Sequence, residues 1–356
     1  MTTTTAHTRI DDRAGAAVEL GLRCAPHPQP AIGASGVRVQ QWVRDRGLTS
    51  SEESFAWYRQ WDTAGFVGAS YPHASTDGMD LVGRFMAVSI LLDDSLEELD
   101  SAAECAQKVA PFVDIVRAGG EVAAPDARPL HQAFGEVIRE CRLRASARWW
   151  RRAAHHWEAS LASVVHEVGD RVLRGRPAPR DIHLSMRRHG GYMHPFLDII
   201  EPAAGFELPE LAFHAPQIAV MRECIVQIGN LVNDLYSLPK EVARGQHTNL
   251  VLVLNAESGG ILARSRQTVV DLVTAHARRF RTLRAELPAM CDYLGLSGAD
   301  RGRVLRYAEA LELWAGGYEP WHRTSARYRH VLTTRPPTGP WAYEELIDTT
   351  TVRAPQ

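Results

Sequence analysis

Two apolar stretches that each end in an acidic cluster constrain the fold and the chemistry of this chain more than any other feature. Residues 85–92 (FMAVSILL) run into residues 93–98 (DDSLEE), and residues 225–232 (IVQIGNLV) run into residues 233–241 (NDLYSLPKE). Carboxylates that follow an apolar helix lie at the edge of a core, where they need cations or bound metal to offset lost hydration. If both edges face one cavity, they form a divalent-metal site for an anionic substrate.

Helical spacing places the polar side chains of each cluster on one face. Asp93 and Glu97 are four residues apart, and Asn233, Ser237 and Glu241 follow one another in steps of four, a drift of only about 80° around the axis. Side chains lean toward the N-terminus of a helix, so the long Glu241 can reach back. Amide, hydroxyl and carboxylate oxygens are ligands that Mg²⁺ prefers. These five residues are the predicted metal ligands.

Composition excludes several other classes of protein. The net charge of −2 gives no basic field for nucleic acid, and the five cysteines contain no CxxC pair. This cysteine usage argues against a disulfide framework and suits a reducing cytosol. The first residues lack the features of a signal peptide, and no uncharged apolar stretch approaches the roughly 18 residues of a membrane span. We therefore expect a cytoplasmic protein with no membrane and no nucleic-acid partner.

The dominant period is helical, and no alternating strand pattern or internal repeat is present, so the predicted fold class is all-α. Predicted helices cover residues 37–46, 76–97, 101–119, 181–189, 215–243, 268–287 and 301–316, with one opened by Ser50-x-x-Glu53 in capping-box form. The arginine-rich stretch 128–173 is predicted as two helices or one broken helix with a solvated face. The predicted organisation is an N-terminal strap or disordered arm (1–35), one helical domain (36–332) and a C-terminal tail (333–356).

The two clusters resemble the metal-binding motifs of class I terpene synthases in their bacterial form, and further elements agree in order and spacing. Arg327-Tyr328 resembles an Arg-Tyr pair near the C-terminus of these enzymes, with Trp321 six residues before it. Arg187 lies 46 residues before Asn233, where the family keeps its diphosphate-sensing arginine. The resemblance covers roughly residues 20–330.

The resemblance implies a helical bundle around a deep apolar pocket that has both motifs at its mouth. It implies three Mg²⁺ ions that hold the diphosphate of an isoprenyl diphosphate substrate, bound by Asp93 and Glu97 on one side and by Asn233, Ser237 and Glu241 on the other. The implied donors to diphosphate oxygens are Arg187, Lys240, Arg327 and Tyr328. Asp94 is expected to pair with Arg187 on closure. A homodimer is also implied.

The resemblance assigns Gly190 and Gly191 to positions that couple the sensing arginine to the reacting cation. Many relatives carry Thr or Asp at the first of these positions, and Arg188 is an alternative sensor one residue out of register. The expected aromatic lining is Phe85, Trp314, Tyr318 and Trp321. Met86, Ser89 and Ile90 replace aromatic residues of many relatives and predict a wider or more aliphatic pocket. Farnesyl diphosphate (C15) is the expected substrate, with geranylgeranyl diphosphate (C20) kept open.

Two rival functions stay open at this level. A chain-elongating prenyltransferase shares the fold and the chemistry, but it would normally carry two Asp-rich motifs. A non-enzymatic, metal-binding helical scaffold would explain the helices but not Arg187, Lys240 and Arg327-Tyr328 together. A protonation-driven cyclase would need an Asp-x-Asp-Asp string, which the sequence lacks.

Overall fold

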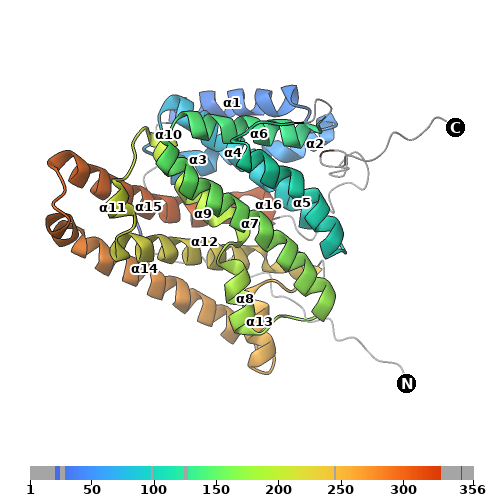
Figure 1. Ribbon diagram of the computed structural model, residues 1–356. Helices are drawn as coiled ribbons and strands as arrows, with labels where there is room; N and C mark the ends of the chain where they lie inside the picture. Colours follow the sequence, from blue (N-terminus) through green and yellow to red (C-terminus); the bar gives the residue numbers. More distant parts are fainter. Residues whose placement is uncertain are drawn as a thin grey trace, which may run out of the picture.

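The computed structural model describes residues 21–24, 29–97, 99–123, 127–243, 246–329 and 346. Every regular element within these ranges is a helix, which confirms the all-α prediction (Figure 1). None of the described helices is both long enough and apolar enough to cross a bilayer.

The first half of the chain forms α1 (Gln29–Asp45), α2 (Glu52–Arg59), α3 (Thr63–Ser70), α4 (Thr76–Glu97), α5 (Ala102–Arg117), α6 (Pro129–Leu143), α7 (Ala147–Arg174) and α8 (Arg180–Arg187). The second half forms the short 3₁₀ helix η1 (Gly190–Tyr192), α9 (Met193–Asp198), α10 (Ile200–Ala204), α11 (Glu210–Phe213), α12 (Pro216–Ala243), α13 (Leu250–Glu257), α14 (Leu262–Tyr293), α15 (Gly298–Thr324) and α16 (Ala326–Arg329).

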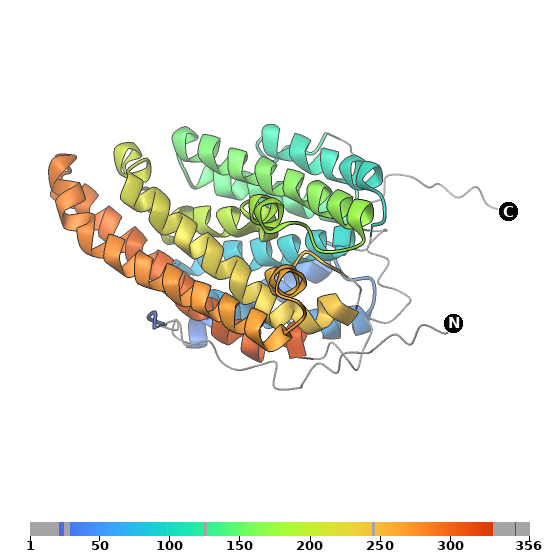
Figure 2. The same ribbon diagram turned by 90° about the horizontal axis from the view of Figure 1, so that it is seen from below.

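The two helices that carry the acidic clusters, α4 and α12, belong to different sides of the bundle. α12 packs against α9, α13, α14 and α15, whereas α4 packs against α1, α3, α6 and α10. Helix α7 contacts α4 and α9, and α9 contacts α12, so these two helices connect the groups. Figure 1 shows α7 passing diagonally across the front of the bundle, and Figure 2 shows the yellow α12 beside the orange α14. The C-terminal halves of α4 and α12 can therefore face one cavity, although about 140 residues separate the two clusters along the chain.

Most predicted helices are confirmed, with corrections at their ends. α1 begins at Gln29, so the predicted arm 1–35 extends seven residues too far into the bundle. α2 is capped by Ser51 rather than Ser50, because Ser51 and Ser54 exchange the two side-chain to backbone hydrogen bonds of a capping box. Pro239 lies inside α12 without ending it. The C-terminal tail prediction falls outside the described residues, apart from position 346.

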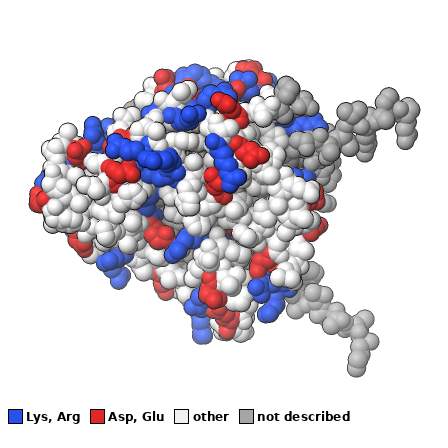
Figure 3. All heavy atoms as spheres, viewed as in Figure 1, with Lys and Arg blue, Asp and Glu red and all other residues white. Residues whose placement is uncertain are grey.

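The arginine-rich stretch forms two helices, α6 and α7, as expected. Its charges are compensated locally: Glu140 of α6 lies 2.7 Å from Arg144 and 2.6 Å from Arg84 of α4. Figure 3 shows basic and acidic side chains interspersed on this face of the molecule. This mixture agrees with a solvated, ion-paired helix surface.

Candidate active site

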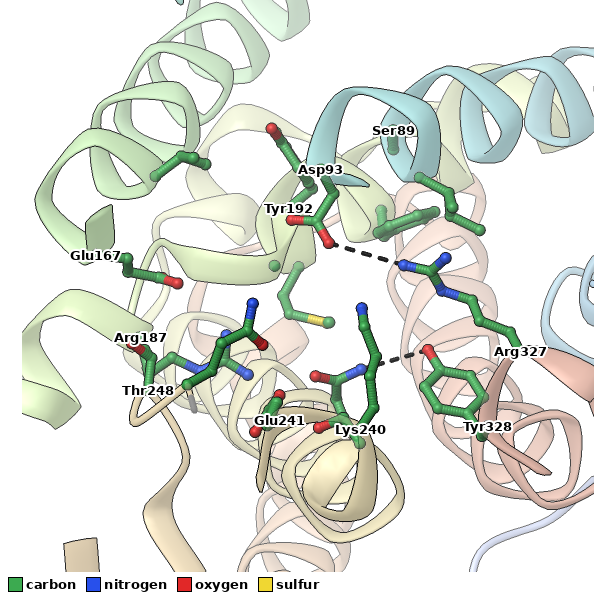
Figure 4. Close-up of a pocket in the computed structure, with 18 of the residues that line it drawn as sticks. Ser89, Asp93, Glu167, Arg187, Tyr192, Lys240, Glu241, Thr248, Arg327 and Tyr328 are labelled. Carbon is green, nitrogen blue, oxygen red and sulfur yellow. Dashed lines mark hydrogen bonds and ion pairs between the residues drawn. The ribbon is translucent and has the colours of Figure 1, made fainter. Parts of the chain in front are cut away.

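A single pocket collects residues from α4, α7, α8, α9, α12, α15 and α16 (Figure 4). It encloses about 1170 Å³ free of protein atoms, its open mouth included. Its polar wall contains Asp93, Glu167, Arg171, Arg187, Asn233, Ser237, Lys240, Glu241, Arg327 and Tyr328. Its apolar wall contains Phe66, Met86, Ile90, Val164, Val168, Tyr192, Met193, Phe196, Tyr318 and Trp321. A charged mouth above an apolar interior suits a ligand with an anionic head and a hydrocarbon chain.

The acidic end of α4 meets the C-terminal helix α16. Arg327 makes a two-point ion pair with Asp94, at 2.7 Å from Nη1 to Oδ2 and 2.6 Å from Nη2 to Oδ1. Its Nη2 also lies 4.0 Å from Asp93, whose side chain remains 45% exposed at the mouth. Burial opposes the charge of Arg327, but the ion pair with Asp94 raises the pKa of Arg327 well above its ordinary value. Glu97 ends α4, and its side chain lies outside the described part of the structure.

In this structure Arg187 pairs with Asp234, and the pairing of Asp94 with Arg187 that is expected on closure stays a prediction. Arg187 Nη2 donates to Asp234 Oδ1 at 2.9 Å, and Figure 4 shows Arg187 and Arg327 on opposite sides of the pocket. The physical reason is helix packing: α8 lies against α13, and Asp234 accepts from the Leu250 amide at the start of α13 at 2.9 Å. Arg187 therefore meets the carboxylate on its own side of the pocket.

The second cluster presents its side chains to the pocket from one face of α12. Asn233, Ser237, Lys240 and Glu241 all line the cavity. The amide Nδ2 of Asn233 donates to the Tyr328 hydroxyl at 3.4 Å, and Glu241 Oε2 accepts from Asn249 Nδ2 at 2.6 Å. Burial, together with the neighbouring charge of Asp234, raises the pKa of Glu241 to about 7. A nearby cation would favour the ionised form of this carboxylate.

The donor set fits a magnesium ion. The buried Ser237 hydroxyl interacts with the Glu241 carboxylate, and both lie on the same pocket wall as Asn233. No group of three or more His, Cys, Asp or Glu gathers as a metal cluster in the described ranges. A metal at this wall would thus bind amide and hydroxyl oxygens along with one carboxylate. Water or phosphate oxygens would complete its coordination shell, as is common for Mg²⁺.

The structure distinguishes the two candidate sensing arginines. Arg187 is buried and lines the pocket, and its carbonyl oxygen accepts from Asn230 Nδ2 of α12 at 2.7 Å. The Arg188 side chain is 63% exposed and lies 3.9 Å from Glu223, beside a separate groove. Only Arg187 is therefore in a position to reach a ligand in this pocket.

The chain reverses between α8 and α9 through two residues with left-handed backbone. Gly191 has φ of +62° and Tyr192 has φ of +56°. Glycine adopts this conformation freely, whereas a non-glycine residue pays about 1–2 kcal/mol for it. Both residues line the pocket. Backbone strain of this kind concentrates at functional sites, and here it brings the Gly191 backbone to the cavity.

The aromatic lining differs from the expected one. Tyr318 and Trp321 line the pocket, and Phe66 and Phe196 join them. Phe85 and Trp314 are absent from the pocket lining among the described residues. Phe85 packs against Phe196 at 4.9 Å between ring centroids, and Trp314 stacks behind Tyr318 at 4.7 Å. Their predicted role in the lining is corrected: both support the aromatic wall from behind.

α4 contributes Met86, Ser89 and Ile90 to the lining, none of which is aromatic, and the wider or more aliphatic pocket expected from them stays a prediction. Sequence reasoning missed Glu167, Tyr192 and Asn249. No motif marks them, since Glu167 is one of several scattered acidic residues of the arginine-rich α7 and Asn249 caps α13 from outside the second cluster.

Comparison with known proteins identifies relatives over most of the chain. Residues 84–279 match the family model described as terpene synthase family 2, C-terminal metal binding. R-linalool synthase of Streptomyces clavuligerus is 31% identical over 92% of this chain and 97% of its own length. The 7-epi-alpha-eudesmol synthase of Streptomyces viridochromogenes, described as farnesyl diphosphate cyclizing, is 30% identical over 82% of this chain and 86% of its own.

Two solved structures share this helical fold over most of their length. The crystal structure of α-eudesmol synthase superimposes with a TM-score of 0.77 at 26% identity, over 85% of this chain and 98% of that one. Linalool/nerolidol synthase from Streptomyces clavuligerus in complex with 2-fluorogeranyl diphosphate gives a TM-score of 0.74 at 29% identity, over 84% of this chain and all of that one.

Proposed function

This chain belongs to the terpene synthase family, and we propose that it ionises farnesyl diphosphate at a Mg²⁺ site between α4 and α12 and cyclises the resulting carbocation. The observation that carries the proposal is the convergence of Asp93 and of Asn233, Ser237 and Glu241 on one pocket. These residues come from two separately packed helices. An apolar interior lies directly behind them.

The proposed metal ligands are Asp93 and Glu97 from α4 and Asn233, Ser237 and Glu241 from α12, with three Mg²⁺ ions as the proposed number. When bound, the metal supplies Lewis-acid stabilisation of the departing diphosphate. Arg187, Lys240, Arg327 and Tyr328 are proposed to donate hydrogen bonds to diphosphate oxygens. Charge-assisted hydrogen bonds from fixed donors stabilise negative charge that develops during ionisation.

Before the substrate binds, the acidic residues hold these donors in place. Asp94 holds Arg327 at 2.6 Å, Lys240 Nζ lies 3.9 Å from Asp94, and Asp234 holds Arg187 at 2.9 Å. A diphosphate that enters the pocket therefore exchanges carboxylate partners for phosphate oxygens, and no guanidinium has to be brought in from solvent. We propose that this exchange draws α16 and α8 toward the ligand.

The apolar wall is proposed to hold the hydrocarbon chain and to exclude water from the cation. Phe66, Phe196, Tyr318 and Trp321 surround the interior. An aromatic face that contacts a desolvated cation contributes about 1–2 kcal/mol. The Gly191 backbone, which reaches the same cavity, is proposed to direct its carbonyl toward the cation.

Farnesyl diphosphate is preferred here because a relative of similar length, the eudesmol synthase, is described as cyclizing it. Geranylgeranyl diphosphate is the alternative substrate, motivated by the aliphatic wall of Met86, Ser89 and Ile90. The prenyltransferase and scaffold alternatives are not favoured, since the relatives compared above are named as terpene synthases. A homodimer and a cytoplasmic location stay predictions from the sequence.

The test is to incubate the purified protein with Mg²⁺ and, separately, geranyl, farnesyl and geranylgeranyl diphosphate, and to identify volatile products by gas chromatography–mass spectrometry. We expect a cyclic hydrocarbon or alcohol from the C15 substrate and none after chelation. A product from the C20 substrate alone would replace the farnesyl assignment. Longer diphosphates formed on adding isopentenyl diphosphate would support the prenyltransferase instead.

A further inference from the structure

Glu167 of α7 lines the pocket, but the proposed reaction gives it no role. Among the described residues, its buried Oε1 has no hydrogen-bond partner. A buried carboxylate oxygen without a partner is unfavourable, and such groups are uncommon in folded proteins. Burial raises the pKa of Glu167 to about 7, against the opposing effect of Arg187. Burial of the Glu167 carboxylate is therefore unfavourable unless a further group binds it.

Arg187 carries the complementary unsatisfied group. Its Nη2 is bound to Asp234 at 2.9 Å, whereas its buried Nε finds no acceptor within the described part of the chain. Asp234 and Glu167 are the two carboxylates that favour the charged form of Arg187 most strongly. A guanidinium presents donors along two edges, so one carboxylate can hold the Nε edge while another group binds the Nη edge.

Gly190 lies directly between these two side chains. A Cβ atom built at this position would stand 2.5 Å from Glu167 Oε1, 3.5 Å from Arg187 Cδ and 3.6 Å from Arg187 Nη1. The first distance is shorter than real Cβ contacts allow. Unlike Gly191, Gly190 does not have a positive φ, so its backbone would accept other residues. A side chain at 190 would therefore have to displace the carboxylate end of the Glu167 side chain.

We propose that Glu167 is a positioning residue for Arg187, and that its carboxylate occupies the space left by the missing side chain at Gly190. This inference deepens, and rests on, the proposed role of Arg187 in binding the diphosphate. As the Nη edge passes from Asp234 to a phosphate oxygen, the Nε edge, which has no acceptor among the described residues of this structure, turns to the Glu167 carboxylate. The carboxylate that orients Arg187 thus comes from a separate helix, α7, on the same side of the pocket (Figure 4), instead of from position 190.

A carboxylate moved from position 167 to position 190 is expected to restore turnover and pyrophosphate binding. The variants are Glu167→Ala, Glu167→Gln, and Glu167→Ala combined in turn with Gly190→Asp, Gly190→Asn and Gly190→Ala. Glu158→Ala is the matched control, because Glu158 is also on α7 but pairs with Arg117 at the surface. Thermal unfolding confirms that each variant is folded. Kinetics with the active prenyl diphosphate give kcat and KM, and calorimetry with Mg²⁺ and inorganic pyrophosphate gives affinity without turnover.

We expect Glu167→Ala to weaken pyrophosphate binding and to lower kcat by about tenfold or more, with a smaller loss in Glu167→Gln. Adding Gly190→Asp to Glu167→Ala recovers most of both losses, and adding Gly190→Ala or Gly190→Asn recovers neither. In the wild-type background, Gly190→Asp is harmful because it clashes with Glu167. A folded Glu167→Ala variant with unchanged kcat and affinity would overturn the proposal, as would equal rescue by Gly190→Ala.

Two outcomes separate the positioning role of Glu167 from the proposed function. If no prenyl diphosphate is turned over but pyrophosphate affinity still depends on Glu167 and on the rescue by Gly190→Asp, the proposed function is wrong and the positioning role stands. If wild-type protein forms a terpene and Glu167→Ala forms it equally well, the positioning role is wrong and the proposed function stands.

Discussion

The guanidinium of Arg327 and the carboxylate of Asp94 face each other edge to edge, joined at 2.6 and 2.7 Å although 233 residues separate them in the chain. This ion pair connects α16 to the end of α4 across the mouth of the pocket. Both side chains are about nine-tenths buried. Under the proposed function, a diphosphate that binds in this pocket would replace this contact.

Because the pair is buried, removing one partner leaves the other charge without compensation. We predict that Asp94→Asn and Arg327→Met each lower the free energy of unfolding by about 3 kcal/mol. The double variant is expected to lose clearly less than the sum of the two. Urea unfolding of all four proteins measures this coupling, and strictly additive losses would show that the pair contributes nothing as a pair.

Ser237 allows a direct test of the metal site, since it is buried in the pocket wall beside Glu241. We predict that Ser237→Ala leaves stability nearly unchanged but raises the Mg²⁺ concentration needed for half-maximal activity by about tenfold. Gln227→Ala is the control, because Gln227 lies on the same helix beside a different groove. An equal Mg²⁺ requirement in both variants would remove Ser237 from the ligand set.

Ser89 is predicted to influence the chain length that the pocket accepts. It lines the cavity from α4, and its hydroxyl makes no hydrogen bond within the described ranges. Ser89→Phe fills the pocket and should lower kcat/KM for farnesyl diphosphate relative to geranyl diphosphate by about tenfold. Ser89→Ala, which removes the hydroxyl without filling the space, should leave this ratio unchanged. A ratio that moves equally in both variants would exclude pocket volume as the cause.

His131 makes stability depend on pH far from the pocket. It is buried beside Phe112, 4.5 Å between ring centroids, and burial lowers its pKa to about 4. The unfolded chain, with a histidine pKa of about 6.5, therefore binds a proton first as the pH falls. This residue's contribution to stability is present above pH 6.5 and is lost between about pH 6.5 and 4.

The matched comparison is with His131→Phe, which cannot titrate. Between pH 7.5 and 5.5 the wild-type protein should lose about 1 kcal/mol more unfolding free energy than the variant. Urea unfolding at both pH values measures the difference, and parallel losses in the two proteins would contradict the buried, neutral state of His131.

Several features of the fold could be predicted because they depend on neighbours in the sequence. The start of α4 at Thr76 and the stretch of α12 follow from the helical period of their apolar residues. The short helices α3, α10, α11 and α13 were missed. At four to eight residues, they are too short to show a period, and their stability comes from packing against the longer helices.

The sequence by itself determined which residues share a helix face, and hence that Asn233, Ser237 and Glu241 face one cavity, because helix geometry is local. Only the tertiary structure decided the ion pairs between helices: Arg187 of α8 with Asp234 of α12, and Arg327 of α16 with Asp94 of α4. The same holds for Glu167 opposite Gly190. These pairings depend on how separate helices pack against one another, and contacts between distant segments leave no periodic signal in the chain.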